Sequence, residues 1–467
     1  MLMRKHLEDP RSAVLADYFE LLRFATVGTD PARLKDCVQC AVWLRDWLKP
    51  LGFSSELIQA EGMAGAPPVL FAERAGAPST ATVLFYGHYD VQPPDPLGEW
   101  RTSPFEPVLK DDGRVYARGA QDDKGQFFSF LCGLKALLEE NASCPLPTIK
   151  IVLEGQEESG STALSRLLSR EVRASSGPDF PGRLKASVLC VCDTSAAADL
   201  RPAIVAGLRG VSHFTLRLEA AARDLHSGAY GGVAPNPAQG MAELLASLHG
   251  ADGSIAVAGF CDRVAKPSDD ELAAAEASAP SLEALEADIG CPPAGGEASL
   301  SPVARMSFRP TIEVNGIHTG YGGPGSKTVI PSSAIAKLSM RLVPDQRPDE
   351  VMELIEGHFR RNAPRGMKVF VEDVTGGAAG FRLPLASPVF RLAASVLEEI
   401  DERGPVFLWD GASIPVVSAL RQVSGAAPLL VGWGQAQDRI HAPNESFGLN
   451  QFARSMEWGA KILPALA

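Results

Sequence analysis

Histidine and carboxylate side chains come directly after two short apolar segments of the chain. His88 and Asp90 follow the first segment, and two adjacent carboxylates, Glu157 and Glu158, follow the second. Residues two apart on a strand point to the same face, so His88 and Asp90 can act together. Adjacent glutamates repel each other unless a cation or a proton separates them. These pairs indicate a cation site, with a solvated turn as the alternative for each pair alone.

Three more histidine or carboxylate residues lie beside predicted strands or helices. Asp122 precedes a helical pattern, Asp193 ends an apolar run, and His441 lies downstream of another. Asp122 alone could simply cap the helix. Two histidines and three carboxylates, one of them bridging, form the ligand set of a dinuclear hydrolytic metal site. The recurrence at strand ends favours the metal site over unrelated surface residues.

Alternating strand and helix patterns must position these side chains. The N-terminal part predicts helices at 12–27, 31–49 and 124–140, and strands near 54–60, 68–74, 81–86, 148–153 and 187–192. Such alternation is typical of an α/β fold whose mostly parallel sheet is covered on both faces. Ligands in such folds bind beyond the carboxyl ends of the strands, where the candidate residues lie.

A second pattern interrupts the first. Alternating polar and apolar residues at 213–219, further strands at 334–343 and 367–374, and a helix at 348–361 predict an α+β domain. The stretch at 250–305 is rich in Ala, Glu, Ser and Pro, and is expected to be a peripheral insertion outside the core. We therefore predict one domain formed by residues 1–207 and 384–467, with a second domain, 208–383, inserted into it.

Composition excludes several classes of function. The 467-residue chain has a net charge of −12 and no evident basic patch, which argues against nucleic acid or an anionic membrane as partner. It lacks an apolar signal segment and a membrane-spanning run, so a cytoplasmic location is expected. The eight cysteines are then expected to be reduced. Cys37 and Cys40 fall within a helical pattern and are interpreted as structural residues.

Four motifs carry a resemblance to a known family. They read Gly-His-Tyr-Asp-Val-Gln-Pro from residue 87, Gly-Ala-Gln-Asp-Asp-Lys-Gly from 119, Glu-Gly-Gln-Glu-Glu-Ser-Gly-Ser from 154 and Arg-Asp-Leu-His-Ser-Gly from 223. The chain resembles the carnosinase-type dipeptidases of metallopeptidase family twenty, which also holds aminoacylase and carboxypeptidase G. The resemblance implies a zinc-peptidase-like catalytic domain with a mostly parallel mixed sheet. It also implies that the inserted domain is a lid that carries a homodimer contact.

The resemblance distributes the metal ligands around a bridging carboxylate. His88 and Asp193 would hold one divalent ion, Glu158 and His441 the other, and Asp122 would bridge them. Zn²⁺ is favoured, although imidazole and carboxylate ligands also suit Mn²⁺ or Co²⁺.

The same resemblance implies catalytic roles. Glu157 would be the general base, and Asp90 would orient His88 through its far ring nitrogen. His226 would cross the dimer to stabilise the oxyanion of the neighbouring subunit's site. The Asp122–Asp123 peptide bond is expected to be cis.

Substrate contacts are implied in the second half of the chain. Thr328 and Arg341 would hold the substrate carboxylate, for which a planar guanidinium is well shaped, and Ser413 matches a further binding position. Trp409 and Ala412 replace the Arg and Gly that the carnosinase type usually has, which puts carnosine-like specificity in doubt.

The leading hypothesis is a metal-dependent hydrolase that cleaves dipeptides or short peptides. Within the family, the ligand at the position of Asp193 is either Asp or Glu. The Asp found here favours substrates with a free α-amino group. The alternative is an amidohydrolase of N-acyl or N-carbamoyl amino acids with the same site. A third hypothesis is a catalytically inactive binding protein. The presence of every expected metal ligand and of the expected base disfavours it.

Overall fold

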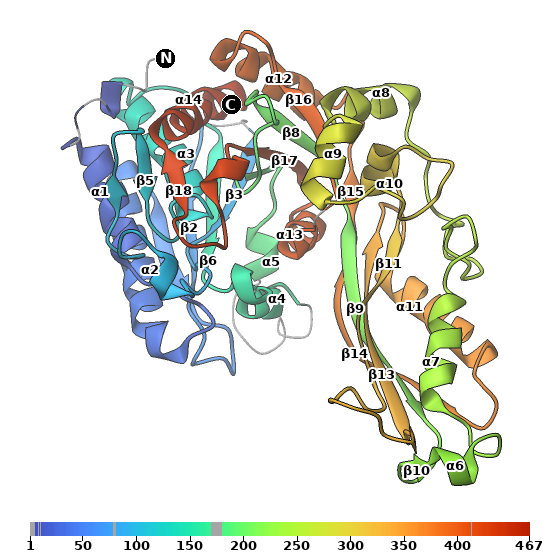
Figure 1. Ribbon diagram of the computed structural model, residues 1–467. Helices are drawn as coiled ribbons and strands as arrows, with labels where there is room; N and C mark the ends of the chain where they lie inside the picture. Colours follow the sequence, from blue (N-terminus) through green and yellow to red (C-terminus); the bar gives the residue numbers. More distant parts are fainter. Residues whose placement is uncertain (1–4, 8, 10, 78–80, 170–179, 412) are drawn as a thin grey trace. The chain divides into compact units, whose positions relative to one another are not determined.

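The computed structural model describes residues 5–7, 9, 11–77, 81–169, 180–411 and 413–467 (Figure 1). Contacts within the chain divide it into two compact units. Unit 1 contains Met1–Ala206, Pro384–Leu408 and Ala419–Ala467, and unit 2 contains Gly207–Leu383 and Trp409–Ser418.

A twisted mixed sheet forms the centre of unit 1. Its strands follow the order β1 (Ser54–Ile58), β2 (Val69–Arg74), β6 (Thr148–Glu154), β3 (Thr82–His88), β7 (Val188–Val191), β17 (Ala427–Gly432) and β8 (Ala203–Leu208). The central strands β6, β3, β7 and β17 are parallel, while β1, β2 and β8 pair antiparallel with their neighbours. Strand β16 (Val406–Asp410) also pairs with β8. The last two residues of β8, Gly207 and Leu208, belong to unit 2 and pair there with β15 (Phe381–Arg382). The predicted mostly parallel sheet is confirmed, and its parallel strands are continuous apolar runs because both faces are buried.

Helices from both ends of the chain cover this sheet. They are α1 (Ala13–Arg23), α2 (Leu34–Leu48), α3 (Lys124–Glu140), α4 (Thr162–Leu168), α5 (Phe180–Arg183), α12 (Pro388–Ile400), the second half of α13 (Pro415–Ser424) and α14 (Leu449–Ala465). Two glycines let α3 and α14 pack closely. A Cβ at Gly133 would lie 2.0 Å from the Met456 carbonyl oxygen, and one at Gly459 would lie 2.4 Å from that of Phe130. Phe130 in turn stacks on Phe85 of β3, with ring centroids 4.4 Å apart.

A small sheet joins two distant parts of the sequence within unit 1. Its strands are β4 (Val108–Leu109), β5 (Arg114–Tyr116) and β18 (Ser446–Gly448), and β5 pairs with both others. The sequence patterns did not predict these short strands. Through β5 and β18, the segment that leads to Asp122 lies beside the segment that follows His441.

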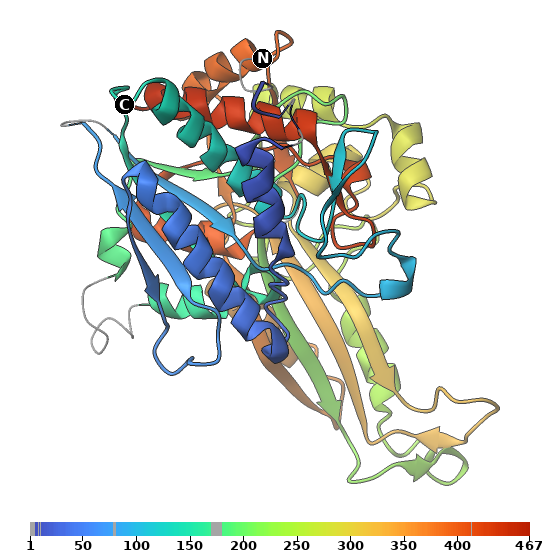
Figure 2. The ribbon, with the colours of Figure 1, turned by 90° about the vertical axis from the view of Figure 1, so that its left-hand side faces the viewer.

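Unit 2 is built on a four-stranded antiparallel sheet with the order β11 (Thr311–Thr319), β13 (Ser333–Leu342), β9 (Gly210–Glu219) and β14 (Lys368–Ala378). Helices α7 (Pro237–Ala246) and α11 (Pro348–Arg361) lie along one face of the sheet (Figure 1). The inward side chains of β9 and β13, such as Leu216 and Met340, form the core with them. A two-stranded ribbon, β10 (Leu225–His226) and β12 (Val329–Ile330), and the short α6 (Ser227–Tyr230) lie at one end of the long strands (Figure 2).

The stretch expected to be peripheral is only partly so. Helices α8 (Asp269–Ser278), α9 (Leu282–Ile289) and α10 (Pro302–Phe308) form there, and the residues of α9 are not buried. However, Val257 and Phe260 belong to the core of unit 2. The prediction was wrong for these residues because isolated apolar side chains in a polar stretch give no periodic signal.

Two smaller expectations can be compared with the structure. Cys37 and Cys40 are buried in α2, and burial raises the pKa of each thiol to about 12, which keeps both protonated and unreactive. Across the part of the chain that the structure describes, no helix has both the length and the apolar character needed to cross a membrane.

Candidate metal centre

The first cluster of possible ligands lies at the carboxyl ends of β3 and β7. His88 ends β3, and Asp193 follows β7 by two residues. Ligand atoms of His88, Asp123 and Asp193 lie within 4.8 Å of one another. His88 Nε2 is 3.8 Å from Asp193 Oδ2 and 3.2 Å from Asp122 Oδ1. Adjacent parallel strands thus bring the predicted residues of the first ion together, with Asp123 beside them.

The second cluster joins three segments that are far apart in the sequence. Asp122, Glu158 and His441 also place their ligand atoms within 4.8 Å of one another. His441 Nε2 lies 2.8 Å from Asp122 Oδ2 and 3.3 Å from Glu158 Oε2. His441 is half exposed, whereas Glu158 is almost fully buried.

Asp122 connects the two clusters through its two oxygens. Oδ1 faces His88 and Oδ2 faces His441, which is the geometry that a bridging carboxylate needs. The peptide bond between Asp122 and Asp123 is cis, which confirms the prediction made from the resemblance.

The charges of the site fit divalent cations. Burial raises the pKa of Glu157 to about 8 and that of Asp193 to about 7. Hydrogen bonds to Asp122 and Glu158 raise the pKa of His441 to about 10. The buried carboxylates repel one another, and a bound cation would relieve this repulsion. Glu158 also has a buried oxygen, Oε1, with no hydrogen-bond partner among the described residues. Imidazole and carboxylate donors with unused oxygens suit Zn²⁺, Mn²⁺ or Co²⁺.

Asp90 does more than orient His88. Its Oδ1 lies 3.3 Å from His88 Nδ1, which is the contact that the resemblance implies. The same carboxylate accepts hydrogen bonds from the backbone N–H groups of Glu157 and Glu158, both at 3.1 Å. Asp90 therefore holds both the His88 ring and the backbone of Glu157 and Glu158. The sequence spacing alone could not reveal this double contact.

The loop that carries His441 has an unusual backbone. Arg439, His441 and Asn444 all adopt positive φ, between 58° and 66°. Left-handed backbone at three non-glycine residues is unfavourable and persists where surrounding contacts fix it. Buried polar anchors supply those contacts here: Asp438 pairs with Arg114, and Asn444 Oδ1 accepts a hydrogen bond from the backbone N–H of Arg101.

Two polar residues beside the ligands were missed as functional candidates. Gln92 donates a hydrogen bond from Nε2 to Glu158 Oε2 at 2.7 Å. Glu445 is fully buried and bonds the loop that carries Asp122. Gln92 stands within the motif that begins at residue 87, shortly after the end of β3, and that position is the signal that could have identified it. Glu445 lies four residues after His441, outside the four motifs.

Comparison with known proteins agrees with this geometry. The model of peptidase family M20/M25/M40 matches residues 84–465. The chain belongs to this family. The predicted family resemblance and the predicted metallopeptidase enzyme class are thereby confirmed.

The similar proteins include peptidases of more than one kind. The chain is 29% identical over 402 residues to Cys-Gly metallodipeptidase dug1 of Schizosaccharomyces pombe, covering 84% of this chain and 81% of that protein. It is 30% identical over 386 residues to human Beta-Ala-His dipeptidase, covering 81% and 73%. An M20 family metallo-carboxypeptidase from Sulfolobus solfataricus superposes with a TM-score of 0.81 at 26% identity, covering 97% of this chain and 99% of that one.

The remaining candidates of this M20 chain lie in unit 2, in two separate places. Arg341 Nη1 donates a hydrogen bond to Ser413 Oγ at 2.8 Å. His226 and Thr328 lie together in the β10–β12 ribbon, where Ser227 N–H donates to the Thr328 carbonyl oxygen at 3.1 Å. Arg341 is near the end of β13, and eight residue steps from Ser333 correspond to about 26 Å. The ribbon lies beyond the Ser333 end of β13 (Figure 1), so one chain does not bring Thr328 and Arg341 together.

A backbone contact selects the tautomer of the His226 ring. Its Nδ1 accepts a hydrogen bond from the backbone N–H of Gly228 at 3.0 Å. The neutral ring therefore carries its proton on Nε2, and the exposed side chain is free to donate from that nitrogen.

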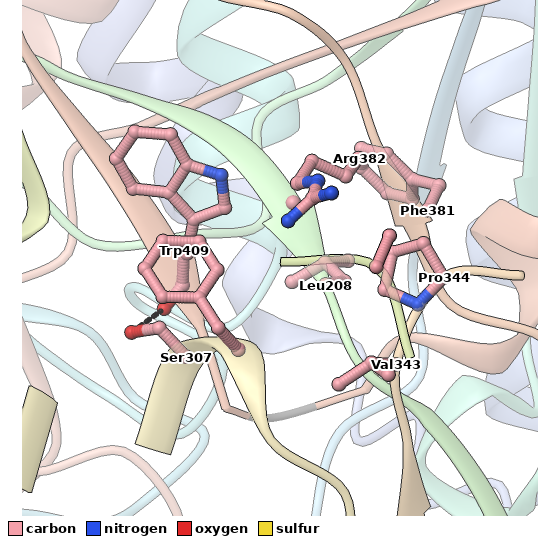
Figure 3. A pocket seen from close by; sticks show the side chains of 10 residues that line it. Leu208, Ser307, Val343, Pro344, Phe381, Arg382 and Trp409 are labelled. Atoms are coloured by element: carbon pink, nitrogen blue, oxygen red, sulfur yellow. Dashed lines mark hydrogen bonds between the residues drawn. The ribbon is translucent and has the colours of Figure 1, made fainter. Parts of the chain in front are cut away.

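Trp409 turns into unit 2 (Figure 3). Its side chain is only 6% exposed and lies against Phe308, with ring centroids 5.3 Å apart. Ser307 Oγ donates a hydrogen bond to the Trp409 carbonyl oxygen at 2.9 Å. The cavity beside the ring has a volume of about 10 Å³, which is too small for a peptide group. The indole therefore packs within unit 2, beside a cavity that cannot hold a peptide group. Ala412 lies outside the described residues.

Proposed function

We propose that this M20 chain is a dinuclear metal-dependent dipeptidase. The observation that supports it most is the double role of Asp122, whose oxygens face two histidines that each have a further carboxylate of their own. Two of the similar curated proteins are named as dipeptidases. The proposed ligands are His88 and Asp193 for one ion, Glu158 and His441 for the other, and Asp122 for both.

The metals, when bound, would polarise the scissile carbonyl and acidify a water molecule. Zn²⁺ is the proposed ion because it binds imidazole and carboxylate ligands readily in hydrolases. Glu157 takes the proton of the attacking water and returns it to the leaving amine. Burial raises the pKa of Glu157 to about 8, so the side chain binds a proton readily in this setting. Asp90 accepts a hydrogen bond from the Glu157 N–H and so holds the backbone that carries this side chain.

The substrate carboxylate is assigned to Arg341, supported by Ser413. Arg341 presents a planar guanidinium whose Nη1 is held by the Ser413 hydroxyl. A guanidinium can form two parallel hydrogen bonds to a carboxylate. The packing of Trp409 supports this arrangement, because Ser307 also holds the Trp409 backbone within unit 2.

We further propose a homodimer in which each subunit completes the site of the other. A dipeptide spans at most about 7 Å when fully extended. The Arg341 end of β13 lies about 26 Å from its Ser333 end, beyond which the ribbon with His226 and Thr328 lies. The two groups of one chain cannot serve the same small substrate. In a symmetric dimer, His226 and Thr328 of one subunit act with the other subunit's metals.

A substrate panel tests the proposed activity. The metal-loaded protein is assayed on dipeptides with free α-amino groups, on N-acyl amino acids and on N-carbamoyl amino acids. We expect hydrolysis of dipeptides with kcat/KM at least tenfold above the other two classes. Preferred cleavage of N-acyl or N-carbamoyl amino acids would replace the proposal with the amidohydrolase alternative.

A further inference from the structure

The buried carboxylate of Glu445 is surrounded by hydrogen-bond donors from one loop. Oε2 accepts from Arg118 Nη1 at 2.8 Å and from the Gly119 N–H at 2.9 Å. Oε1 accepts from the Gln121 N–H at 2.9 Å and from the Asp122 N–H at 3.1 Å. Glu445 has no exposed surface, so these four bonds replace its hydration shell.

The loop at 118–122 is thus shaped around the Glu445 side chain. Gly119 has a φ of 79°, and this left-handed residue lets successive N–H groups turn toward the same carboxylate. The backbone of Ala117 also donates to the Glu445 carbonyl oxygen at 3.2 Å. The backbone of Asp122, the proposed bridging ligand, is held directly by Glu445.

Glu445 also belongs to the segment that carries His441, four residues earlier. Between them the chain passes through the left-handed residues His441 and Asn444, which limits how the segment can relax. The other anchors of this segment bond elsewhere: Asp438 bonds Arg114 and Gln451, and Asn444 bonds the backbone at Glu99 and Arg101. Together with the β5–β18 pairing, Glu445 therefore ties the segment of His441 to the Asp122 loop, where His441 Nε2 and Asp122 Oδ2 lie 2.8 Å apart.

The third ligand of the second cluster is tied to the same network. Arg118, which is held by Glu445, also donates from Nη2 to the Pro93 carbonyl oxygen at 3.1 Å. The preceding residue, Gln92, donates to Glu158 Oε2. In contrast, His88 ends strand β3 and Asp193 closely follows β7, so the central sheet places them.

We infer that Glu445 is a positioning residue that sets the spacing of the second cluster, Asp122, Glu158 and His441, and thereby the affinity of one metal site more than that of the other. This inference rests on the proposed dinuclear site. Residues that support metal ligands from outside the coordination sphere typically change metal affinity by about 10- to 100-fold. A general loss of stability would instead weaken both sites.

The test is a titration of the metal-free protein with Co²⁺ in competition with a chelator, together with metal content after dialysis. The wild type is expected to bind two ions. Glu445→Gln keeps the size of the side chain but directs an amide group toward N–H donors. We expect it to bind one ion with affinity within threefold of wild type and the other 10- to 100-fold more weakly.

Two further backgrounds identify the affected site. With His441→Ala, which removes a ligand of the second cluster, Glu445→Gln should change the affinity of the remaining ion by less than threefold. With Asp193→Ala, which removes a ligand of the first cluster, Glu445→Gln should lower the affinity of the remaining ion by the full 10- to 100-fold. Equal effects in the two backgrounds, or none in either, would overturn the inference.

Controls separate positioning from folding. Asp401→Asn removes another carboxylate of unit 1 that pairs with two arginines, Arg403 and Arg454, and should leave both Co²⁺ affinities unchanged. If Glu445→Gln does not fold, Arg118→Gln keeps the three backbone bonds, and the same selective loss is then expected at a smaller size. Absence of that selectivity in a folded Arg118→Gln protein also refutes the inference. A wild type that binds fewer than two ions contradicts the proposed function itself, whichever way the variants behave.

Discussion

A site shared between two subunits predicts that two inactive variants restore each other. Glu157→Ala removes the proposed base and leaves His226 intact. His226→Ala keeps the base and the metal ligands but removes the proposed oxyanion donor. Each protein alone should be almost inactive, because loss of one such donor costs on the order of 10²–10³ in rate. Mixed dimers of the two variants should regain activity.

The size of the recovery follows from the structure and from symmetry. His226 lies in a ribbon beyond one end of β13, and Arg341 is about 26 Å away near the other end of that strand. A single dipeptide cannot contact both in one chain, so in the proposed dimer each active site takes His226 from the other subunit. At random, about half of the dimers are mixed, and one of their two sites has both residues intact. Activity should therefore reach about a quarter of the wild-type value.

The assay is co-expression of the two variants with different affinity tags, followed by purification through both tags. This selects mixed dimers only, so the expected activity rises to about half of the wild type. Each variant purified alone and metal-loaded is the control. Mixed dimers with no more activity than the separate variants would refute the shared site and place His226 within its own chain or outside catalysis.

Three further predictions concern the base, the metals and stability. Glu157→Gln should retain both ions and lose turnover, whereas Glu158→Gln should lose most of one ion; metal analysis showing equal loss in both variants contradicts these roles. Chelation followed by dialysis should abolish hydrolysis, and Zn²⁺, Mn²⁺ or Co²⁺ should restore it; activity that survives complete metal removal rules out the mechanism. Hydrogen bonds from Arg403 lower the pKa of Asp401 to about 2. Because this folded-state pKa lies below the unfolded value, Asp401 stabilises the fold fully above about pH 4, and this contribution is lost as the pH falls through about 2. Asp401→Asn should thus lose about 1–2 kcal/mol of unfolding free energy at pH 7 and nothing near pH 2, as measured by urea titration across pH; a difference that does not change with pH contradicts this account.

The candidate site could largely be predicted because its residues follow strong local patterns. His88 and Asp193 come after continuous apolar runs, and parallel strands place such positions at one edge of a sheet. The motifs around Asp122 and Glu157 added the family resemblance, which also implied the cis bond that the structure contains.

The remaining features depend on contacts between distant segments. Glu445 bonds residues more than three hundred positions earlier, and no local pattern records such a pairing. The strands β4, β5 and β18 are only two or three residues long, too short for an alternation to be seen. The ring of Trp409 packs against that of Phe308, which lies far from it in the sequence. Tertiary packing decides each of these cases.

Unit 2 is made of two separate sequence segments, which matters for chimaeras between family members. The segment Trp409–Ser418 is separate in sequence from Gly207–Leu383 but belongs to the same unit. Arg209 donates to the Gly411 carbonyl oxygen at 2.8 Å, and Arg341 donates to Ser413. In a chimaera that exchanges only 207–383, Trp409 from one parent would have to pack against residues from the other parent. Crossover points that keep the unit whole must exchange both segments, with breakpoints near 206, 383, 408 and 418.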